Sequence, residues 1–121
     1  MGWIKRLFGR PKREPPVRGE KWTLTQRVEA ADEVPDSLGP TEAVLVGTSR
    51  QPTWLIFDCP CGRGHRVMLN LHASRYPRWR IQTEAPLSVY PSIDDRTESR
   101  RCHFFIRDGH TIWARQTPPQ E

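Results

Sequence analysis

Apolar and polar residues alternate in several short runs along the chain, as in residues 66–71 and 78–83. Neighbouring side chains on a strand point to opposite faces, so a period of two predicts strands with one buried face. Short apolar runs bounded by turn residues predict further, more deeply buried strands. The predicted strands are residues 21–28, 43–47, 53–57, 66–71, 78–83, 87–90, 103–107 and 111–114.

Turn signals separate these runs. Asp108-Gly109 stands between the last two of them, and Asp-Gly favours a tight hairpin because glycine accepts a positive φ. Residues 29–43 are acidic, contain Pro35 and Pro40, and are expected to form a loop. Strands at this close spacing predict an all-β fold, a small antiparallel sandwich or barrel-like sheet.

The chain has 121 residues, which is the size of one ordinary domain. Twelve prolines argue against a helical bundle, because proline inside a helix removes a hydrogen bond. We therefore expect a single β domain over residues 21–121 with its core in residues 43–115, preceded by a tail of residues 1–20. A core this small gains much from a structural metal.

The formal net charge of +5 is concentrated in the tail. Residues 1–20 hold six basic and two acidic side chains, or +4, which leaves +1 for the rest. The tail is interpreted either as disordered or as a short amphipathic segment that touches a partner or, weakly, a membrane surface. The sequence contains no run of about 20 apolar residues, so no membrane-spanning helix is predicted.

The three cysteines, an odd number without a secretion signal, argue against a disulfide framework and favour the cytoplasm. Cys59 and Cys61 lie in a Cys-Pro-Cys-Gly-Arg-Gly-His stretch, and Cys102-His103 opens a later strand. Three sulfurs and one nitrogen form a ligand set that zinc favours. The predicted zinc ligands are therefore Cys59, Cys61, Cys102 and His103.

One geometric objection concerns the fourth ligand. Cys102 and His103 are adjacent, so on a regular strand only one of them can face the metal. His65 follows Cys61 across two glycines and is the alternative ligand. Two other interpretations of the cysteines stay open: three buried thiols that act as small apolar groups, or a reactive Cys59–Cys61 redox pair.

Five short motifs between residues 43 and 115 carry a family resemblance. They are Trp54-Leu-Ile-Phe-Asp-Cys-Pro-Cys-Gly62, Val67-Met-Leu-Asn-Leu71, Pro77-Arg-Trp79, Pro91-Ser-Ile93, and Cys102-His-Phe-Phe-Ile106 followed by Gly109 and Trp113. In this pattern the chain resembles a small bacterial zinc-binding family of unknown function. Its members are often encoded beside bacterial ubiquitin-like proteins and their activating and conjugating enzymes. The resemblance implies a partner among those proteins, a role in antiviral defence, and His103 as the preferred fourth ligand.

Three classes of function follow from these observations. The first is a non-catalytic zinc-binding adaptor or accessory protein of a ubiquitin-like modification system. The second is binding of single-stranded nucleic acid through arginines and an aromatic ring. The third is a zinc-dependent hydrolase or ligase accessory subunit, for which a ligand position must stay open. The candidate binding residues are Arg63, Arg66, Arg78, Trp79 and Arg101.

Ser92 and the acidic residues after it are further candidates for chemistry. The Pro91-Ser92-Ile93 motif positions Ser92 either as a functional hydroxyl or as a turn former at a strand end. The order of residues supports no Ser-His-Asp arrangement, and no Gly-x-Ser-x-Gly elbow is present. Asp94, Asp95 and Glu98 are expected to lie in a solvated loop. An enzymatic role is thus less favoured than a binding role.

Overall fold

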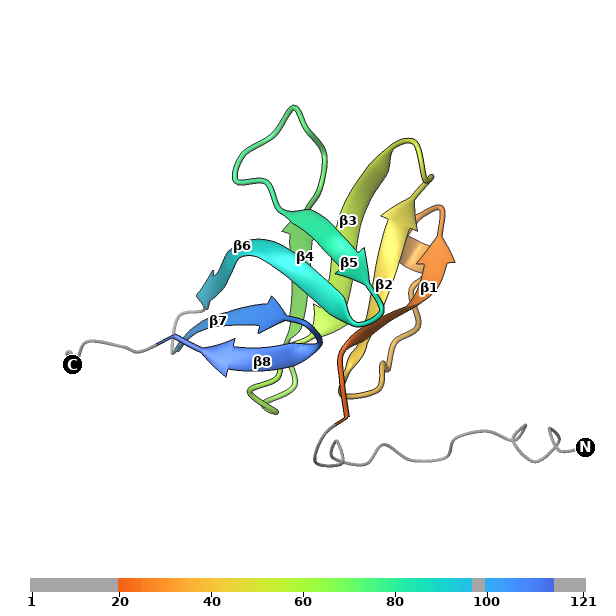
Figure 1. The fold of residues 1–121 in the computed structure, drawn as a ribbon. Coiled ribbons are helices and arrows are strands. Elements are labelled where there is room, and N and C mark those ends of the chain that lie inside the picture. The colour runs from red at the N-terminus through yellow and green to blue at the C-terminus, as the bar shows by residue number, and fades with distance from the viewer. Residues whose placement is uncertain (1–19, 97–99, 115–121) are drawn as a thin grey trace, which may run out of the picture.

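The computed structural model describes residues 20–96 and 100–114. Eight strands form two four-stranded sheets, which we call sheet A and sheet B (Figure 1). Sheet A contains β1 (Thr23–Val28), β2 (Glu42–Gly47), β3 (Pro52–Asp58) and β4 (Arg66–Asn70), in that order. Sheet B contains β5 (Arg80–Glu84), β6 (Leu87–Arg96), β7 (Arg101–Arg107) and β8 (His110–Trp113). All neighbouring strands are antiparallel except β1 and β2, which are parallel.

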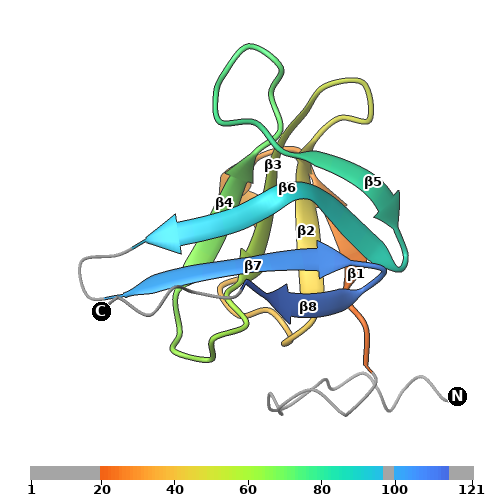
Figure 2. The same cartoon turned by 60° about the vertical axis from the view of Figure 1, so that its left-hand side comes forward.

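The two sheets pack face to face, and their strands cross at a steep angle (Figure 2). Their inner faces carry the alternating apolar side chains and form one buried cluster from both sheets. Phe57 of β3 lies at its centre, with ring centroids 5.1 Å from Trp22 and 6.3 Å from Phe104, both edge to face. Such contacts between buried rings fix how the two sheets sit on each other.

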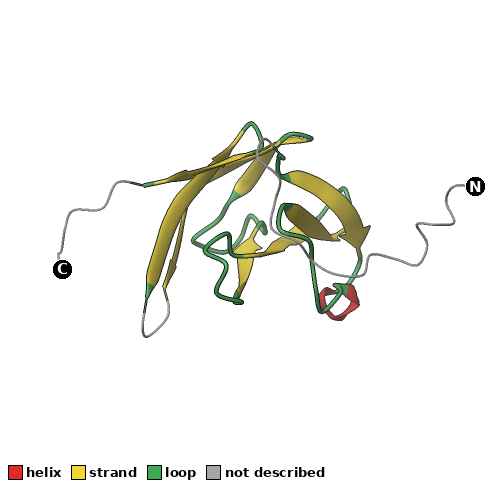
Figure 3. Cartoon of the chain, turned by 90° about the horizontal axis from the view of Figure 1, so that it is seen from below, coloured by secondary structure: helices red, strands yellow, loops and turns green. Residues whose placement is uncertain are grey.

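The outer face of sheet A is also covered. The segment between β1 and β2 contains the short 3-10 helix η1 (Ala31–Glu33), seen at the periphery of the molecule in Figure 3. Val34 and Leu38 of this segment are buried against Val44 and Ile56. This explains the continuous apolar run in β2, whose residues are buried on both faces.

A three-way backbone connection ties the start of β1 to sheet B. Trp22 N–H donates to Gly109 O, Gly109 N–H donates to Leu87 O, and Leu87 N–H donates to Trp22 O, at 2.8, 2.8 and 3.0 Å. Gly109 has φ +81° and Asp108 φ +51°, as the predicted hairpin turn requires. The turn between β7 and β8 therefore also holds the sheets together.

The predicted all-β fold is confirmed, and η1 is the one helical element among the described residues. One expectation was wrong: Asp94 and Asp95 do not lie in a loop, because β6 continues past Pro91 as far as Arg96. Both carboxylates have cationic or imidazole partners, which stabilise acidic residues on a strand. Glu98 and residues 1–19 of the predicted tail, which covers residues 1–20, lie outside the described residues.

Candidate active site and metal centre

Three cysteines and one histidine meet where the β3–β4 turn approaches β7. Cys59, Cys61, His65 and Cys102 each offer one ligand atom, and all four atoms lie within 4.8 Å of one another. His65 Nε2 lies 3.2 Å from Cys61 Sγ and 3.9 Å from Cys102 Sγ. All three cysteines are free thiols. The four side chains form a group that fits a single metal ion.

The turn that carries the first three members is shaped by its glycines and backbone hydrogen bonds. Gly62 and Gly64 have φ of +79° and +89°, a region in which other side chains are strained. Cys59 N–H donates to His65 O at 2.9 Å, which closes the turn into a knuckle. This closure brings His65 back onto the cysteines that precede it.

The thiols differ in how readily they ionise. Burial raises the pKa of Cys59 and of Cys102. Burial acts in the same direction on Cys61, but hydrogen bonds from the Arg63 N–H and from the other two thiols outweigh it and lower its pKa. The Arg63 N–H lies 3.4 Å from Cys61 Sγ. If one of the three clustered thiols is ionised, the thiolate is therefore favoured at Cys61.

A carboxylate orients the His65 ring so that it can bind a metal. Its Nδ1 lies 3.1 Å from Asp95 Oδ2, whereas its Nε2 faces the thiols. A proton held on Nδ1 by Asp95 leaves the Nε2 lone pair free for a metal. Asp95 is half-buried on β6, opposite Cys102 of β7 in the strand register. The strand that holds Asp95 thus also supports the metal centre.

His103, which the sequence favoured as the fourth ligand, lies on the other face of β7. Its Nε2 is 3.0 Å from Ser92 Oγ of β6. Cys102 points inward and is buried, and the neighbouring His103 points outward, as strand alternation requires. The alternative ligand, His65, occupies the position in the cluster. His103 is therefore part of a second site with Ser92.

An irregular stretch of β6 presents Ser92 to His103. Val89 and Ile93 of β6 pair with Ile106 and Phe104 of β7, which are closer together in sequence. The register therefore shifts here, and β6 bulges between Val89 and Ile93. Such bulges re-aim side chains and occur next to active sites. Trp79 Nε1 donates to Ser92 O at 3.1 Å and holds the backbone of the bulge.

The ring of His103 is also positioned. It stacks on Phe105, with centroids 6.1 Å apart and an interplanar angle of 27°. Among the described residues no carboxylate forms a hydrogen bond or ion pair with His103. Asp94 is its cross-strand neighbour, but the Asp94 carboxylate receives two hydrogen bonds from Arg101, each 2.9 Å long. These bonds hold the pKa of Asp94 well below its usual range. The site is a serine–histidine dyad.

A second serine–histidine contact has a different character. Ser74 Oγ lies 2.7 Å from His72 Nδ1, and both residues belong to the exposed connection between β4 and β5. The same Nδ1 accepts the Ser74 backbone N–H at 3.2 Å. This is a local turn in which the imidazole caps the backbone, as short polar side chains do elsewhere. The Ser92–His103 pair joins two strands and opens into a groove.

That groove has a volume of about 570 Å³. It runs beside Ser92 and is lined by the aromatic residues Tyr76, Trp79, Tyr90 and Phe105 and by the arginines Arg78, Arg80 and Arg107. A concave, largely aromatic surface beside a candidate nucleophile is a typical place for substrate. Ser92 is half-buried at this groove rather than fully enclosed.

The predicted binding residues are not gathered in one place. Arg78 and Trp79 line the groove. Arg63 is exposed in the cysteine turn, and Arg66 pairs with Asp58 at 3.1 Å. Arg101 lies beside the dyad, but its guanidinium forms an ion pair with Asp94 of the same chain.

Residues 30–114 match the model of a family described as bacterial ubiquitination-like system serine protease (BubE). The chain belongs to the BubE family. This confirms the resemblance to a bacterial family associated with ubiquitin-like conjugation, and it makes the chain a component of a bacterial ubiquitination-like system. Comparisons with curated proteins and with solved structures gave no match. No helix in the described part of this BubE family member is long and apolar enough to cross a membrane.

Sequence reasoning did not bring Ser92 and His103 together. They are separated by a bulge and a strand connection, so spacing gives no direct signal of the contact. The sequence did contain one signal. If Cys102 faces the metal, strand alternation turns His103 to the opposite face of the sheet, where residues of β6 on that face, such as Ser92, can contact it.

Proposed function

We propose that this BubE family member is a serine protease in which Ser92 is the nucleophile and His103 the general base. The observation that carries the proposal is the 3.0 Å contact between Ser92 Oγ and His103 Nε2. This is the hydrogen-bond distance at which an imidazole can take the hydroxyl proton. The family description, which names a serine protease, supports the same chemistry.

The reaction follows from this geometry. As Ser92 Oγ forms a bond to the carbonyl carbon of the scissile peptide, its proton moves to His103 Nε2. The protonated imidazole then gives that proton to the leaving amine as the C–N bond breaks. Water, deprotonated by the same ring, attacks the acyl group and releases Ser92. The stacked Phe105 ring and the Trp79 hydrogen bond keep base and nucleophile aligned during both steps.

The proposed role of the metal is structural, and its proposed identity is zinc. Cys59, Cys61, Cys102 and His65 would supply three thiolates and one imidazole, a complete set of four ligands that would leave no position open for a catalytic water. With Zn–S of about 2.3 Å and Zn–N of about 2.1 Å, sulfur and nitrogen ligands lie about 3.6 Å apart. The distances of 3.2 and 3.9 Å from His65 Nε2 to two sulfurs bracket this value. These contacts favour a structural zinc site over the catalytic site of a zinc-dependent hydrolase.

The proposed setting is a cytoplasmic ubiquitin-like modification pathway with a role in defence, where polypeptides of the pathway serve as partners. The non-catalytic adaptor interpretation keeps the same partners but predicts no reactive serine. The Ser92–His103 contact beside the groove favours a chain that is cut over a partner that is only held. A test of serine reactivity therefore distinguishes the two.

The test is covalent labelling with a fluorophosphonate, followed by mass-spectrometric mapping of the modified residue. Wild-type protein is expected to be labelled at Ser92, and Ser92→Ala is expected to remain unlabelled. Ser74→Ala is the matched control, because it removes the other serine in contact with a histidine and should label like wild type. Folded, metal-loaded protein that does not label at Ser92 would leave the adaptor interpretation in place of the protease.

A further inference from the structure

The outer face of sheet B around the dyad is rich in arginine. Strand alternation places Arg96 and Ser92 on this face of β6, and Arg101, His103 and Arg107 on the same face of β7. Arg80 of β5 lies opposite Tyr90 in the register and joins them. The one carboxylate on this face of β6 and β7, among the described residues, is Asp94. Its charge is already compensated by Arg101 and Arg96.

The arginines that line the groove itself keep their charge uncompensated. In the described part of the chain, Arg78 and Arg80 are exposed and form no ion pair. The guanidinium of Arg107 lies 3.7 Å from the centroid of the Tyr90 ring, and one of its nitrogens donates to Val89 O at 2.6 Å. These contacts fix Arg107 in position without neutralising it. The groove therefore presents three positive charges beside the nucleophile and no negative one.

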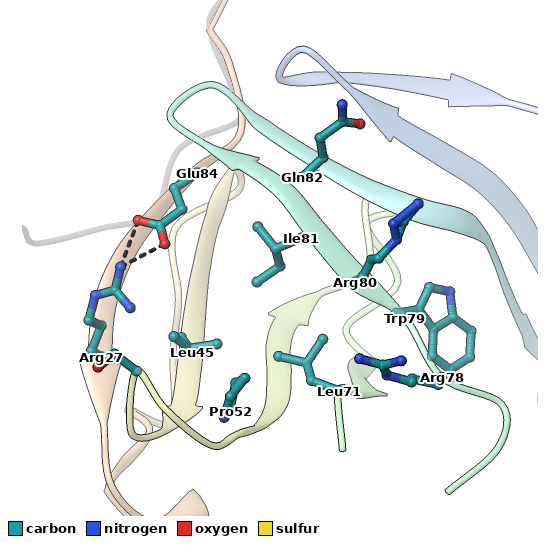
Figure 4. A pocket seen from close by; sticks show the side chains of 11 residues that line it. Arg27, Leu45, Pro52, Leu71, Arg78, Trp79, Arg80, Ile81, Gln82 and Glu84 are labelled. Atoms are coloured by element: carbon teal, nitrogen blue, oxygen red, sulfur yellow. Dashed lines mark hydrogen bonds and ion pairs between the residues drawn. The ribbon is translucent and has the colours of Figure 1, made fainter. Parts of the chain in front are cut away.

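A second hollow adjoins the groove on the far side of the Arg78-Trp79-Arg80 segment. It has a volume of about 450 Å³ and an apolar wall that includes Leu45, Leu71 and Ile81. Figure 4 shows Arg78 and Arg80 at its edge, while Arg27 is joined to Glu84, the acidic residue in its lining. Arg78 and Arg80 thus line both hollows, and the Arg80 guanidinium lies 5.7 Å from the centroid of the Tyr90 ring. From there both guanidinium groups can reach a chain bound in the groove.

We infer that the groove selects polypeptides that carry a carboxylate close to the scissile bond. This inference rests on the proposed protease function, because it takes Ser92 as the point of cleavage. Guanidinium groups bind carboxylates through paired, charge-assisted hydrogen bonds. Arg78 and Arg80 are free to form such bonds, whereas Arg101 is occupied by Asp94. The carboxylate can be an acidic side chain or the end of a polypeptide, since both offer the same two oxygens.

The experiment measures binding and labelling on the same metal-loaded protein. Binding is followed by fluorescence anisotropy of a fluorescein-labelled, amidated hexapeptide of alternating alanine and glutamate. The comparison peptides contain glutamine in place of glutamate, one amidated and one with a free terminal carboxylate. Oligothymidylate serves as the nucleic-acid probe. Protection of Ser92 from fluorophosphonate is measured with unlabelled versions of each probe.

The glutamate peptide is expected to bind about fivefold more tightly than the amidated glutamine peptide, to weaken as salt rises, and to protect Ser92. The double variant Arg78→Gln/Arg80→Gln should lose this preference. Arg75→Gln should keep it, because Arg75 lies in the same connection but lines a different hollow with His72 and Trp54. If the free-carboxylate glutamine peptide gains this advantage and the amidated glutamate peptide does not, the carboxylate recognised is a chain end.

Two results would overturn the inference while leaving the protease intact: equal binding of all three peptides, or tighter binding of oligothymidylate with Ser92 still labelled. The opposite pattern separates the two proposals as well. If glutamate peptides bind preferentially but Ser92 never reacts with fluorophosphonate, the carboxylate-binding groove stands and the protease does not.

Discussion

Cys102 and His103 are neighbours on β7, yet their side chains belong to different sites on opposite faces of sheet B. Cys102 Sγ lies 3.9 Å from His65 Nε2 in the cysteine cluster, and His103 Nε2 lies 3.0 Å from Ser92 Oγ. One peptide bond therefore links the metal centre to the dyad. Movement of the proposed ligand Cys102 would therefore be transmitted directly to His103, the proposed base.

Replacement of His103 by glutamine is expected to slow fluorophosphonate labelling of Ser92 by about a hundredfold or more. A general base contributes about that factor, and glutamine cannot accept the proton. Metal content and melting temperature should stay close to wild type, because the ring is outside the cluster. Loss of the metal in this variant would instead make His103 a ligand, as the sequence first suggested.

Replacement of His65 by alanine is expected to release the metal and lower the melting temperature, because binding of a structural metal is coupled to folding. Elemental analysis of purified protein and thermal unfolding measure the two effects. Asp95→Asn is a milder test of the same arrangement, since it removes the carboxylate 3.1 Å from His65 Nδ1. It should weaken metal affinity by about 10- to 100-fold. Full metal content in His65→Ala would contradict the arrangement.

Removal of the metal by a chelator is expected to slow labelling of Ser92 even though no ligand belongs to the dyad. Without the metal, Cys102 is no longer fixed, and the strand that carries His103 loses one anchor. Labelling rate is measured before chelation, after it, and after zinc is restored. An unchanged rate in protein that has lost its metal would show that the two faces of β7 are independent.

Substitution of Gly109 by alanine is expected to destabilise the fold by roughly 1–3 kcal/mol, because it forces a side chain into a strained backbone region. The added Cβ would also lie 2.6 Å from Lys21 Cβ, within the connection between β1 and sheet B. Gly64→Ala is the matched control, with φ +89° but no atom within 4 Å of its Cβ. Chemical denaturation of the metal-loaded proteins should show the larger loss at Gly109; equal losses would exclude the contact as a cause.

Local pattern was sufficient for most of the fold. The alternation in residues 66–71 and the Asp108-Gly109 turn depend on side-chain period and on backbone conformation, and both are properties of neighbouring residues. The end of β6 was missed because Asp94 and Asp95 disfavour strands by themselves. Their stabilising partners lie on other elements, Arg101 on β7 and His65 in the β3–β4 turn, and these pairings appear only when the chain is folded.

The sites show the same limit more sharply. Clustering of Cys59 and Cys61 in the chain predicted the start of a metal centre, and Cys102 completed the sulfur set. The choice between His65 and His103 depends on which face of β7 points inward, and the dyad depends on a bulge that turns Ser92 toward β7. Register shifts of this kind are set by tertiary packing, so residue spacing alone does not reveal them.

The most direct test of the central claim is to trap the acyl group that Ser92 must carry during turnover. Wild-type protein is mixed with p-nitrophenyl acetate, quenched with acid at successive times, and mapped by mass spectrometry. The account predicts an acetyl group on Ser92 that appears and then decays, a much slower appearance in His103→Gln, and none in Ser92→Ala. Acetylation confined to Cys61, Ser74 or another side chain, with Ser92 unmodified, would contradict it.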